Sequence, residues 1–147
     1  MRDDGVTVRP AHWPGDRDRL TLVREAVFVV EQGVPRELEW DGEDAGASHW
    51  LAEDGNGNPV GVGRLLPTGQ VGRMAVLPAW RGCGVGRRLL AAALDGARER
   101  GFAEVWLNAQ TSALPFYAAQ GFVAEGGEFD EAGIPHRRMR LTLEFRT

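Results

Sequence analysis

The chain has 147 residues, of which 43% are hydrophobic and 26% are charged, and these proportions predict one globular domain that spans residues 1–147. Its net charge of −4 argues against nucleic acid or an anionic membrane surface as the main partner. The single cysteine excludes an internal disulfide framework, and the sequence carries no signal peptide pattern or apolar run long enough to span a membrane. We therefore expect a cytoplasmic protein.

The first third of the sequence predicts a strand, a helix and a long loop. Residues 6–9 have the composition of a strand, which Pro10 ends. Asp16 or Asp18 is expected to cap a helix that continues to about residue 30, because apolar residues recur there at helical spacing. The acid-rich stretch 31–47 predicts an irregular loop with one short helix, and a loop of that length is more often functional than idle.

The middle of the sequence predicts an antiparallel meander of three strands. Strands at 48–53 and 59–66 flank the turn-forming run Asp-Gly-Asn-Gly-Asn. A second turn at 67–69 leads into a short apolar strand at 71–77, which Pro78 ends because proline has no N–H to give a sheet.

A helix and a strand follow the meander. An apolar stripe from Val85 to Ala97 predicts an amphipathic helix that ends before Gly101. Residues 103–108 then read as a strand, and a strand reached through a helical crossover is expected to lie parallel to the strand at 71–77.

The chain is expected to close with a short helix and two paired strands. Ser112 would cap a helix at 113–120, and residues 122–124 would pair antiparallel with residues 138–145. The sequence thus predicts an α/β fold with a mixed sheet of the α+β kind, mostly antiparallel and with one parallel pair.

The segment Arg81–Gly86 predicts an anion site. It joins the strand at 71–77 to a helix through a glycine-rich turn, which places unpaired backbone N–H groups at the positive end of the helix dipole. Arg81, Arg87 and Arg88 add positive charge, so phosphate is the expected occupant.

Two common nucleotide motifs do not match this segment. A P-loop requires Lys-Ser or Lys-Thr after its last glycine, whereas Arg87 and Arg88 follow Gly86. A dinucleotide-binding fingerprint requires a later glycine and an acidic residue after the next strand, where we read Asn108. A nucleotide-binding protein of another kind, using the same loop, stays a minor alternative.

The segment instead resembles the pyrophosphate loop of the GCN5-related N-acetyltransferases (GNAT family), Arg/Gln-x-x-Gly-x-Gly/Ala, with Arg81, Gly84 and Gly86 at its fixed positions. The order of the expected elements is also that of the GNAT fold. Five further matches resemble the ElaA-type branch of the family: Ala26–Gln32, Asn108–Gln110, Phe116–Tyr117, Gly121–Phe122 and Gly133–His136. The resemblance covers nearly the whole chain and implies a single acyl-CoA N-acyltransferase domain whose parallel strand pair lies at the CoA site.

The resemblance also implies which residues bind acetyl-CoA. Backbone groups of the strand at 71–77 would pair with the pantetheine arm, the N–H near Val76 would polarise the thioester, and a β-bulge with splayed strands would free these groups. The side-chain amide of Asn108 is expected to bond pantetheine, with a turn-forming role as the alternative. The full set is Met74, Ala75, Val76, Arg81, Gly82, Cys83, Gly84, Val85, Gly86, Arg87, Asn108, Phe116 and Tyr117.

Tyr117, the only tyrosine, matches the usual general acid of the family and would protonate the departing thiolate, since phenol and thiol pKa values lie close together. The alternative is an aromatic residue that packs beside Phe116. For the general base, Glu31 and His136 are favoured because both lie in the ElaA-type matches. His49, Glu128 and Asp130 stay open as further candidates for the base.

These expectations describe an N-acetyltransferase that transfers the acetyl group of acetyl-CoA directly to an amine. The alternative is a non-catalytic module that binds or senses acyl-CoA. Acid-rich stretches suggest a cationic acceptor, although exposed acidic runs are usually only solvated. Cys83 is expected to be a small filler rather than a nucleophile, and no metal is expected from the spacing of His and Cys. Members of this fold often pair through their sheets, so a homodimer is one expected assembly.

Overall fold

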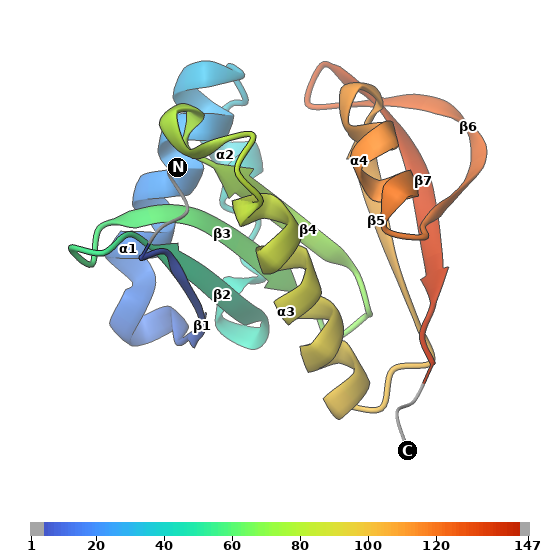
Figure 1. Ribbon diagram of the computed structural model, residues 1–147. Coiled ribbons are helices and arrows are strands. Elements are labelled where there is room, and N and C mark those ends of the chain that lie inside the picture. Colours follow the sequence, from blue (N-terminus) through green and yellow to red (C-terminus); the bar gives the residue numbers. More distant parts are fainter. Residues whose placement is uncertain (1–4, 145–147) are drawn as a thin grey trace.

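A computed structural model describes residues 5–144, and its elements follow the expected order (Figure 1). The strands are β1 (Thr7–Ala11), β2 (Ser48–Glu53), β3 (Pro59–Leu65), β4 (Val71–Val76), β5 (Glu104–Gln110), β6 (Val123–Glu131) and β7 (Ile134–Thr142). The α-helices are α1 (Trp13–Arg24), α2 (Arg36–Glu39), α3 (Val85–Glu99) and α4 (Leu114–Ala119), and a π-helical segment, η1 (Glu25–Glu31), continues α1. Short 3₁₀ turns are η2 (Asp44–Gly46), η3 (Pro78–Trp80) and η4 (Thr111–Ala113).

The strands form two antiparallel sheets that touch at one point. The first sheet has the order β1-β2-β3-β4 and the second the order β5-β7-β6. The expected parallel pair, β4 and β5, meets only through a bridge between Gln70 and Trp106, where the Trp106 N–H donates to the carbonyl of Gly69 at 3.1 Å. Beyond that bridge the two strands diverge, as Figure 1 shows.

Helices cover both faces of the first sheet. The expected apolar stripe of α3 is buried, with Leu89, Leu90 and Ala93 at no more than 1% exposure, in the larger core cluster. On the other face Leu20 and Val23 of α1 pack in a second cluster. None of the helices among residues 5–144 is long and apolar enough to cross a membrane.

The first helix begins earlier than expected, at Trp13 rather than at Asp16 or Asp18. Pro14 lies in its first turn, where its fixed φ suits a helix and its missing N–H costs nothing. Asp16 does serve the helix start, but from inside the helix, because its carboxylate accepts the backbone N–H of His12 at 3.0 Å. The expected end near residue 30 is close to the end of η1 at Glu31.

The last two strands differ most from expectation. They were expected at 122–124 and 138–145, but the described strands each have nine residues, and residue 145 lies outside the described part. Ala132 and Gly133 both have positive φ, 55° and 77°, which is the backbone of a tight two-residue hairpin turn. Gly126 and Gly127 lie in an irregular part of β6, not in a loop, because the pairing with β7 shifts register between Glu125 and Phe129.

Ser112 does not cap the helix that follows it. It lies inside the 3₁₀ turn η4, and α4 begins at Leu114 with no side-chain hydrogen bond at its N-cap, Ala113. Pro115 in the first turn of α4 supplies the helical φ instead.

The acid-rich stretch 31–47 contains the expected short helix, α2, but several of its acids are not solvated. Glu39 and Asp44 are 3% and 6% exposed and both bond to the buried guanidinium of Arg24, at 2.8 and 2.7 Å. Arg64 and Arg73 complete the network by pairing with acids of the same stretch. These carboxylates are neutralised internally and do not offer free charge to a cationic acceptor.

Candidate functional site

A β-bulge in β4 opens the gap between the two sheets. Val62 pairs with Ala75 and Arg64 pairs with Gly72, so Arg73 and Met74 together face the single residue Gly63. A Cβ at position 63 would lie 2.7 Å from the Met74 sulfur, so only glycine leaves Met74 this place. The expected bulge and splayed strands are confirmed.

The end of β4 turns its backbone toward this gap. The Leu77 N–H donates to the Val60 carbonyl at 2.9 Å, which makes that pair hydrogen-bonded. Hydrogen-bonded and non-hydrogen-bonded pairs alternate in an antiparallel ladder, so the N–H and C=O of Val76 point away from β3. Consistent with this direction, the Val76 carbonyl accepts the Arg81 Nε–H at 2.8 Å.

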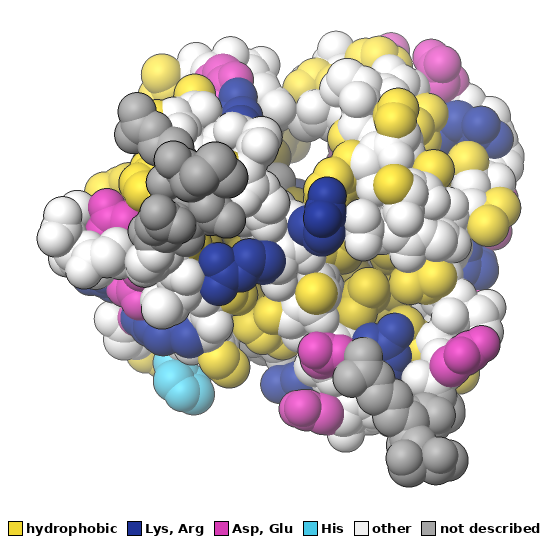
Figure 2. Space-filling model, in the orientation of Figure 1, with side chains coloured by type: hydrophobic (Ala, Val, Ile, Leu, Met, Phe, Trp, Pro, Cys, Tyr) yellow, Lys and Arg dark blue, Asp and Glu magenta, His cyan; other side chains and the backbone are white. Residues whose placement is uncertain are grey.

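A cavity of about 1010 Å³ occupies the gap. Figure 2 shows the surface hollowed between the part of the molecule built on the first sheet and the part that carries α4. The residues of the expected site that line the cavity are Met74, Ala75, Val76, Arg81, Gly86, Asn108, Phe116, Tyr117 and His136. Gly82, Cys83, Gly84, Val85, Arg87 and Glu31 lie outside that lining.

The loop before α3 has the geometry of an anion site. Gly82 and Gly84 have φ of 78° and 90°, which L side chains rarely adopt, and nothing lies within 4 Å of the place where a Cβ would be. The first helical bond runs from the Arg88 N–H to the Gly84 carbonyl at 3.1 Å. The N–H groups of the first helical residues therefore lack a partner inside α3, and no side chain caps them. The loop therefore presents unpaired N–H donors of the kind that bind an anion.

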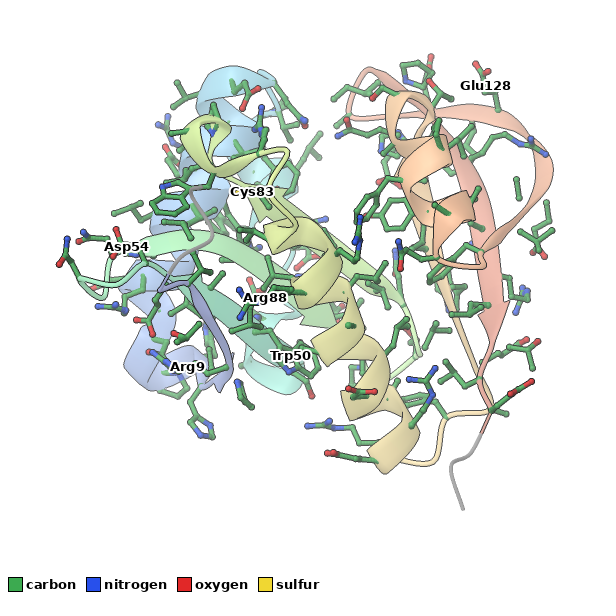
Figure 3. The ribbon with its side chains drawn as sticks, in the orientation of Figure 1. Arg9, Trp50, Asp54, Cys83, Arg88 and Glu128 are labelled. Atoms are coloured by element: carbon green, nitrogen blue, oxygen red, sulfur yellow. The ribbon has the colours of Figure 1, made fainter. Side chains whose placement is uncertain are left out.

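The other residues near the loop divide into two kinds. Arg87 is exposed beside the loop, whereas Arg88 donates to the Val6 carbonyl at 3.0 Å and so holds the N-terminal segment (Figure 3). The Cys83 thiol points to the Trp80 carbonyl at 3.0 Å and packs against the core, in keeping with a small filler (Figure 3).

Glu31 binds Arg81. Its two carboxylate oxygens accept from the Arg81 guanidinium at 2.6 and 2.7 Å, and this pair joins the end of η1 to the anion loop. The hydrogen bond from Arg81 holds the pKa of Glu31 below its usual value. This pairing positions Arg81 beside the loop, and it differs from the raised pKa expected of a general base, so a role of Glu31 in proton transfer stays a prediction.

Tyr117 lies in an aromatic group on α4. Its ring packs edge-on against Phe116 and Phe122, with centroids 5.0 and 5.8 Å apart. Burial raises the pKa of Tyr117 to about 12, so the phenol stays protonated at any physiological pH. The raised pKa of Tyr117 lies further from the pKa of a thiol than the ordinary tyrosine pKa assumed from the sequence.

His136 is the histidine that faces the cavity. It is 6% exposed, and its Nδ1 lies 2.6 Å from the Ile134 carbonyl oxygen, which can only accept. Nδ1 therefore carries the proton of the neutral ring, and the lone pair is on Nε2. This is the tautomer that can accept a proton from a molecule in the cavity.

The other candidates for the base lie elsewhere. His49 stacks on Trp13 and its Nε2 is 2.8 Å from the Asp44 carbonyl, and burial lowers the pKa of His49. His49 is thus a core residue. Glu128 and Asp130 are exposed on β6 and do not line the cavity, and Figure 3 shows Glu128 at the outer edge of the molecule.

Sequence reasoning gave no role to Glu131, or to Gln32 and Gln110 although both glutamines lie in the ElaA-type matches, and all three residues line the cavity. Gln110 donates to Gln32 at 2.8 Å and so links β5 to the segment after η1. Recognition of a hairpin turn at Ala132 and Gly133 would have placed Glu131 beside His136, because the turn sets the register of the two strands.

Comparison with known proteins agrees with this geometry. A sequence model described as "Acetyltransferase (GNAT) domain" matches residues 15–143. The Bacillus subtilis protein named "Uncharacterized N-acetyltransferase YjcF" is 42% identical over 121 residues, which are 80% of this chain and 86% of that protein.

Two solved structures have the same fold over almost their whole length. An acyl-CoA N-acyltransferase from Pseudomonas aeruginosa has a TM-score of 0.81 and 31% identity, covering 92% of this chain and 98% of that one. Escherichia coli ElaA has a TM-score of 0.82 and 30% identity, covering 91% and 98%. With the splayed strands, the glycine-rich anion loop and these matches, the chain belongs to the GNAT family of acetyltransferases and resembles its ElaA-type branch.

Proposed function

We propose that the protein is an N-acetyltransferase that transfers the acetyl group of acetyl-CoA directly to an amine. One observation carries the proposal: the same cavity is lined by residues of β4, by the anion-loop arginine Arg81 and by His136. A phosphate-bearing donor and a proton acceptor can therefore meet in the gap between β4 and β5.

The donor side of the cavity is formed by β4, α3 and α4. The anion loop would hold the pyrophosphate through its N–H groups, and Arg81, positioned by Glu31, would add a charged contact. Gly86 and Phe116 line the path from the loop to β4. The Val76 N–H, which points away from β3, would donate to the thioester oxygen as negative charge develops there.

Acetyl-CoA supplies an activated acyl group as its thioester. His136 Nε2 would take a proton from the ammonium form of the acceptor, which frees the nitrogen lone pair to form the new C–N bond as the C–S bond breaks. The second proton that this nitrogen loses as the amide forms would pass to solvent. Tyr117 would donate its phenolic proton to the departing sulfur, and solvent would return that proton. The products are an N-acetyl amide and CoA.

The test is CoA release from acetyl-CoA against a panel of amines (polyamines, amino acids, aminoglycosides and peptide N-termini), with Tyr117→Phe beside the wild type. We expect amine-dependent release that falls about 100-fold or more in the variant, because general acid catalysis contributes at least that much. CoA affinity, followed by calorimetry, should be nearly unchanged, since only a hydroxyl is removed.

Two outcomes would contradict the proposal. CoA binding without release on any amine would favour a non-catalytic module that binds or senses acyl-CoA. No CoA binding by the wild type would remove the basis for reading residues 81–86 as a pyrophosphate loop.

A further inference from the structure

One face of the second sheet carries four of the polar side chains that line the cavity. Gln110 of β5 and Phe129 of β6 both lie directly opposite His136, and Asn108 lies opposite Arg138. Residues directly opposite in an antiparallel pair share a face, as do residues two apart on one strand. Asn108, Gln110, His136 and Glu131 therefore share one face of β5, β7 and β6.

The opposite face of the same strands is apolar. It carries Leu107 and Met139, which are buried in the core cluster with α3 and alongside Phe116 and Tyr117. The polar face thus looks away from the helices that form the donor side. The side chain of Asn108, which we expected at the pantetheine, is on this polar face.

Three acceptor atoms on the polar face lack a donor among the described residues. The Asn108 Nδ2 donates to Glu131 Oε1 at 3.3 Å, which leaves Asn108 Oδ1 buried and without a partner. His136 Nε2 carries a lone pair, because Nδ1 donates to Ile134. Glu131 Oε2 lies 3.8 Å from that Nε2, so two acceptors face each other with nothing between them to donate.

A primary ammonium group has the donors that this arrangement lacks. One nitrogen can lie at an ordinary hydrogen-bond distance of about 2.9 Å from both His136 Nε2 and Glu131 Oε2. The carboxylate of Glu131 would balance the charge, and the Asn108 Nδ2 donor at 3.3 Å holds that carboxylate in place. Glu131 is 47% exposed, so a molecule can reach it from solvent.

We infer that Glu131 and His136 form the binding site for the ammonium group of the acceptor, with Asn108 holding the Glu131 carboxylate, and that the acceptor is a small cationic primary amine. It enters on the face of β5, β7 and β6 that looks away from α4. Gln110 is not part of the site because its amide is bonded to Gln32. This inference rests on the proposed function, since it names the substrate class of the same cavity.

The test is a binding measurement that requires no turnover. The protein contains three histidines, so side-chain ¹H–¹⁵N spectra of the CoA-bound protein can be assigned with single His variants. Propylammonium chloride is the probe. Tetramethylammonium chloride, a cation without N–H donors, and sodium chloride at equal ionic strength are the controls.

We expect propylammonium to shift the His136 side-chain signals, and neither control salt to do so. Glu131→Gln keeps the shape but removes the charge, and should weaken the apparent affinity about 10- to 100-fold, as loss of a charged hydrogen bond does. Glu128→Gln, an exposed carboxylate on the same strand, should behave as the wild type. Any amine found as a substrate should show the same loss as a raised KM, with the KM for acetyl-CoA unchanged.

The inference fails if His136 does not respond, if tetramethylammonium acts as well as propylammonium, or if Glu131→Gln binds as the wild type does. Calorimetry of CoA on the same samples separates the two proposals. CoA binding with no response of His136 overturns only the ammonium site, whereas absent CoA binding in the wild type overturns the proposed function.

Discussion

Gly84 sets the backbone shape of the glycine-rich loop before α3. It is the N-cap of α3 with φ of 90°, a conformation that costs other L residues roughly 1–2 kcal/mol. The same backbone conformation leaves the N–H groups of the first turn of α3 without an intrahelical partner, so they can donate to an anion.

Gly84→Ala is therefore expected to raise the KM for acetyl-CoA several-fold or more, because alanine disfavours a φ of 90° and the loop would relax away from its present shape. The matched control is Gly101→Ala, past the other end of α3, where φ is 82° and nothing lies within 4 Å of a new Cβ. Steady-state kinetics of both variants measure the KM for acetyl-CoA, and thermal unfolding measures their stability. Equal effects on KM would mean that the loop geometry does not serve the donor.

Family resemblance indicated that Glu31 belongs to the site, but it did not indicate that Glu31 pairs with Arg81. Its carboxylate belongs to a bidentate pair with Arg81, fifty positions along the chain. Sequence position alone cannot distinguish a carboxylate that accepts protons from one that holds a guanidinium, because the distinction depends on what lies within about 3 Å.

At the scale of elements, a buried charge network holds the segment between η1 and β2 against the first sheet. Arg24 of α1 bonds Glu39 and Asp44, and Asp44 also bonds Arg64 of β3. The segment contributes Gln32, Val34 and Leu38 to the cavity wall. The network thus positions one side of the cavity, and its members Glu39, Asp41, Arg64 and Arg73 line that side.

Asp44→Asn should lower the free energy of unfolding by about 3 kcal/mol or more, because loss of one partner leaves buried guanidinium charge uncompensated. Burial raises the pKa of Asp44, but hydrogen bonds from Arg24 and Arg64 outweigh it and lower the pKa below its usual value. The stabilisation is therefore present above about pH 4 and is lost as the pH falls below it, so the variant and wild type should converge in acid.

Urea unfolding at several pH values measures this difference, with Glu43→Gln as the control. Glu43 is the exposed neighbour in sequence, and its replacement should change stability by less than about 0.5 kcal/mol. A constant difference between wild type and Asp44→Asn across pH would show that the carboxylate's charge is not what stabilises the segment.

At the scale of the whole molecule, the two sheets are joined between β4 and β5 by the bridge of Gln70 with Trp106. The cavity occupies the rest of the gap, and the Val76 N–H of β4 points away from β3 at its side. A bound acetyl-CoA that paired with β4 and reached the anion loop would therefore add contacts across the gap between the two sheets.

Acetyl-CoA at about 100 times its Kd should add about 2.7 kcal/mol to stability and raise Tm by roughly 5 to 10 °C. Hydrogen exchange should slow at Val76 as well as at the start of α3. ADP, which has a pyrophosphate but no pantetheine, is the control and should protect only the start of α3. Equal protection by both ligands would contradict a role for β4 in holding the donor.

Much of this protein could be predicted locally. The order of elements, the apolar stripe of α3 and the anion loop depend on short-range spacing and on glycines at positions that need positive φ, and all three are present. The final hairpin was misplaced because Gly126 and Gly127 suggested a loop, whereas they form an irregular part of β6 whose flanking residues, Glu125 and Phe129, pair with β7.

The sequence by itself determined the family, the fold and the glycine-rich loop before α3, since motif and periodicity are properties of neighbouring residues. Only the tertiary structure paired Glu31 with Arg81, placed His136 but not His49 at the cavity, buried Asp44 and brought Glu131 close to His136. Each of these depends on contacts between distant segments, and a side chain's charge, tautomer and accessibility are set by those contacts and not by its neighbours in the chain.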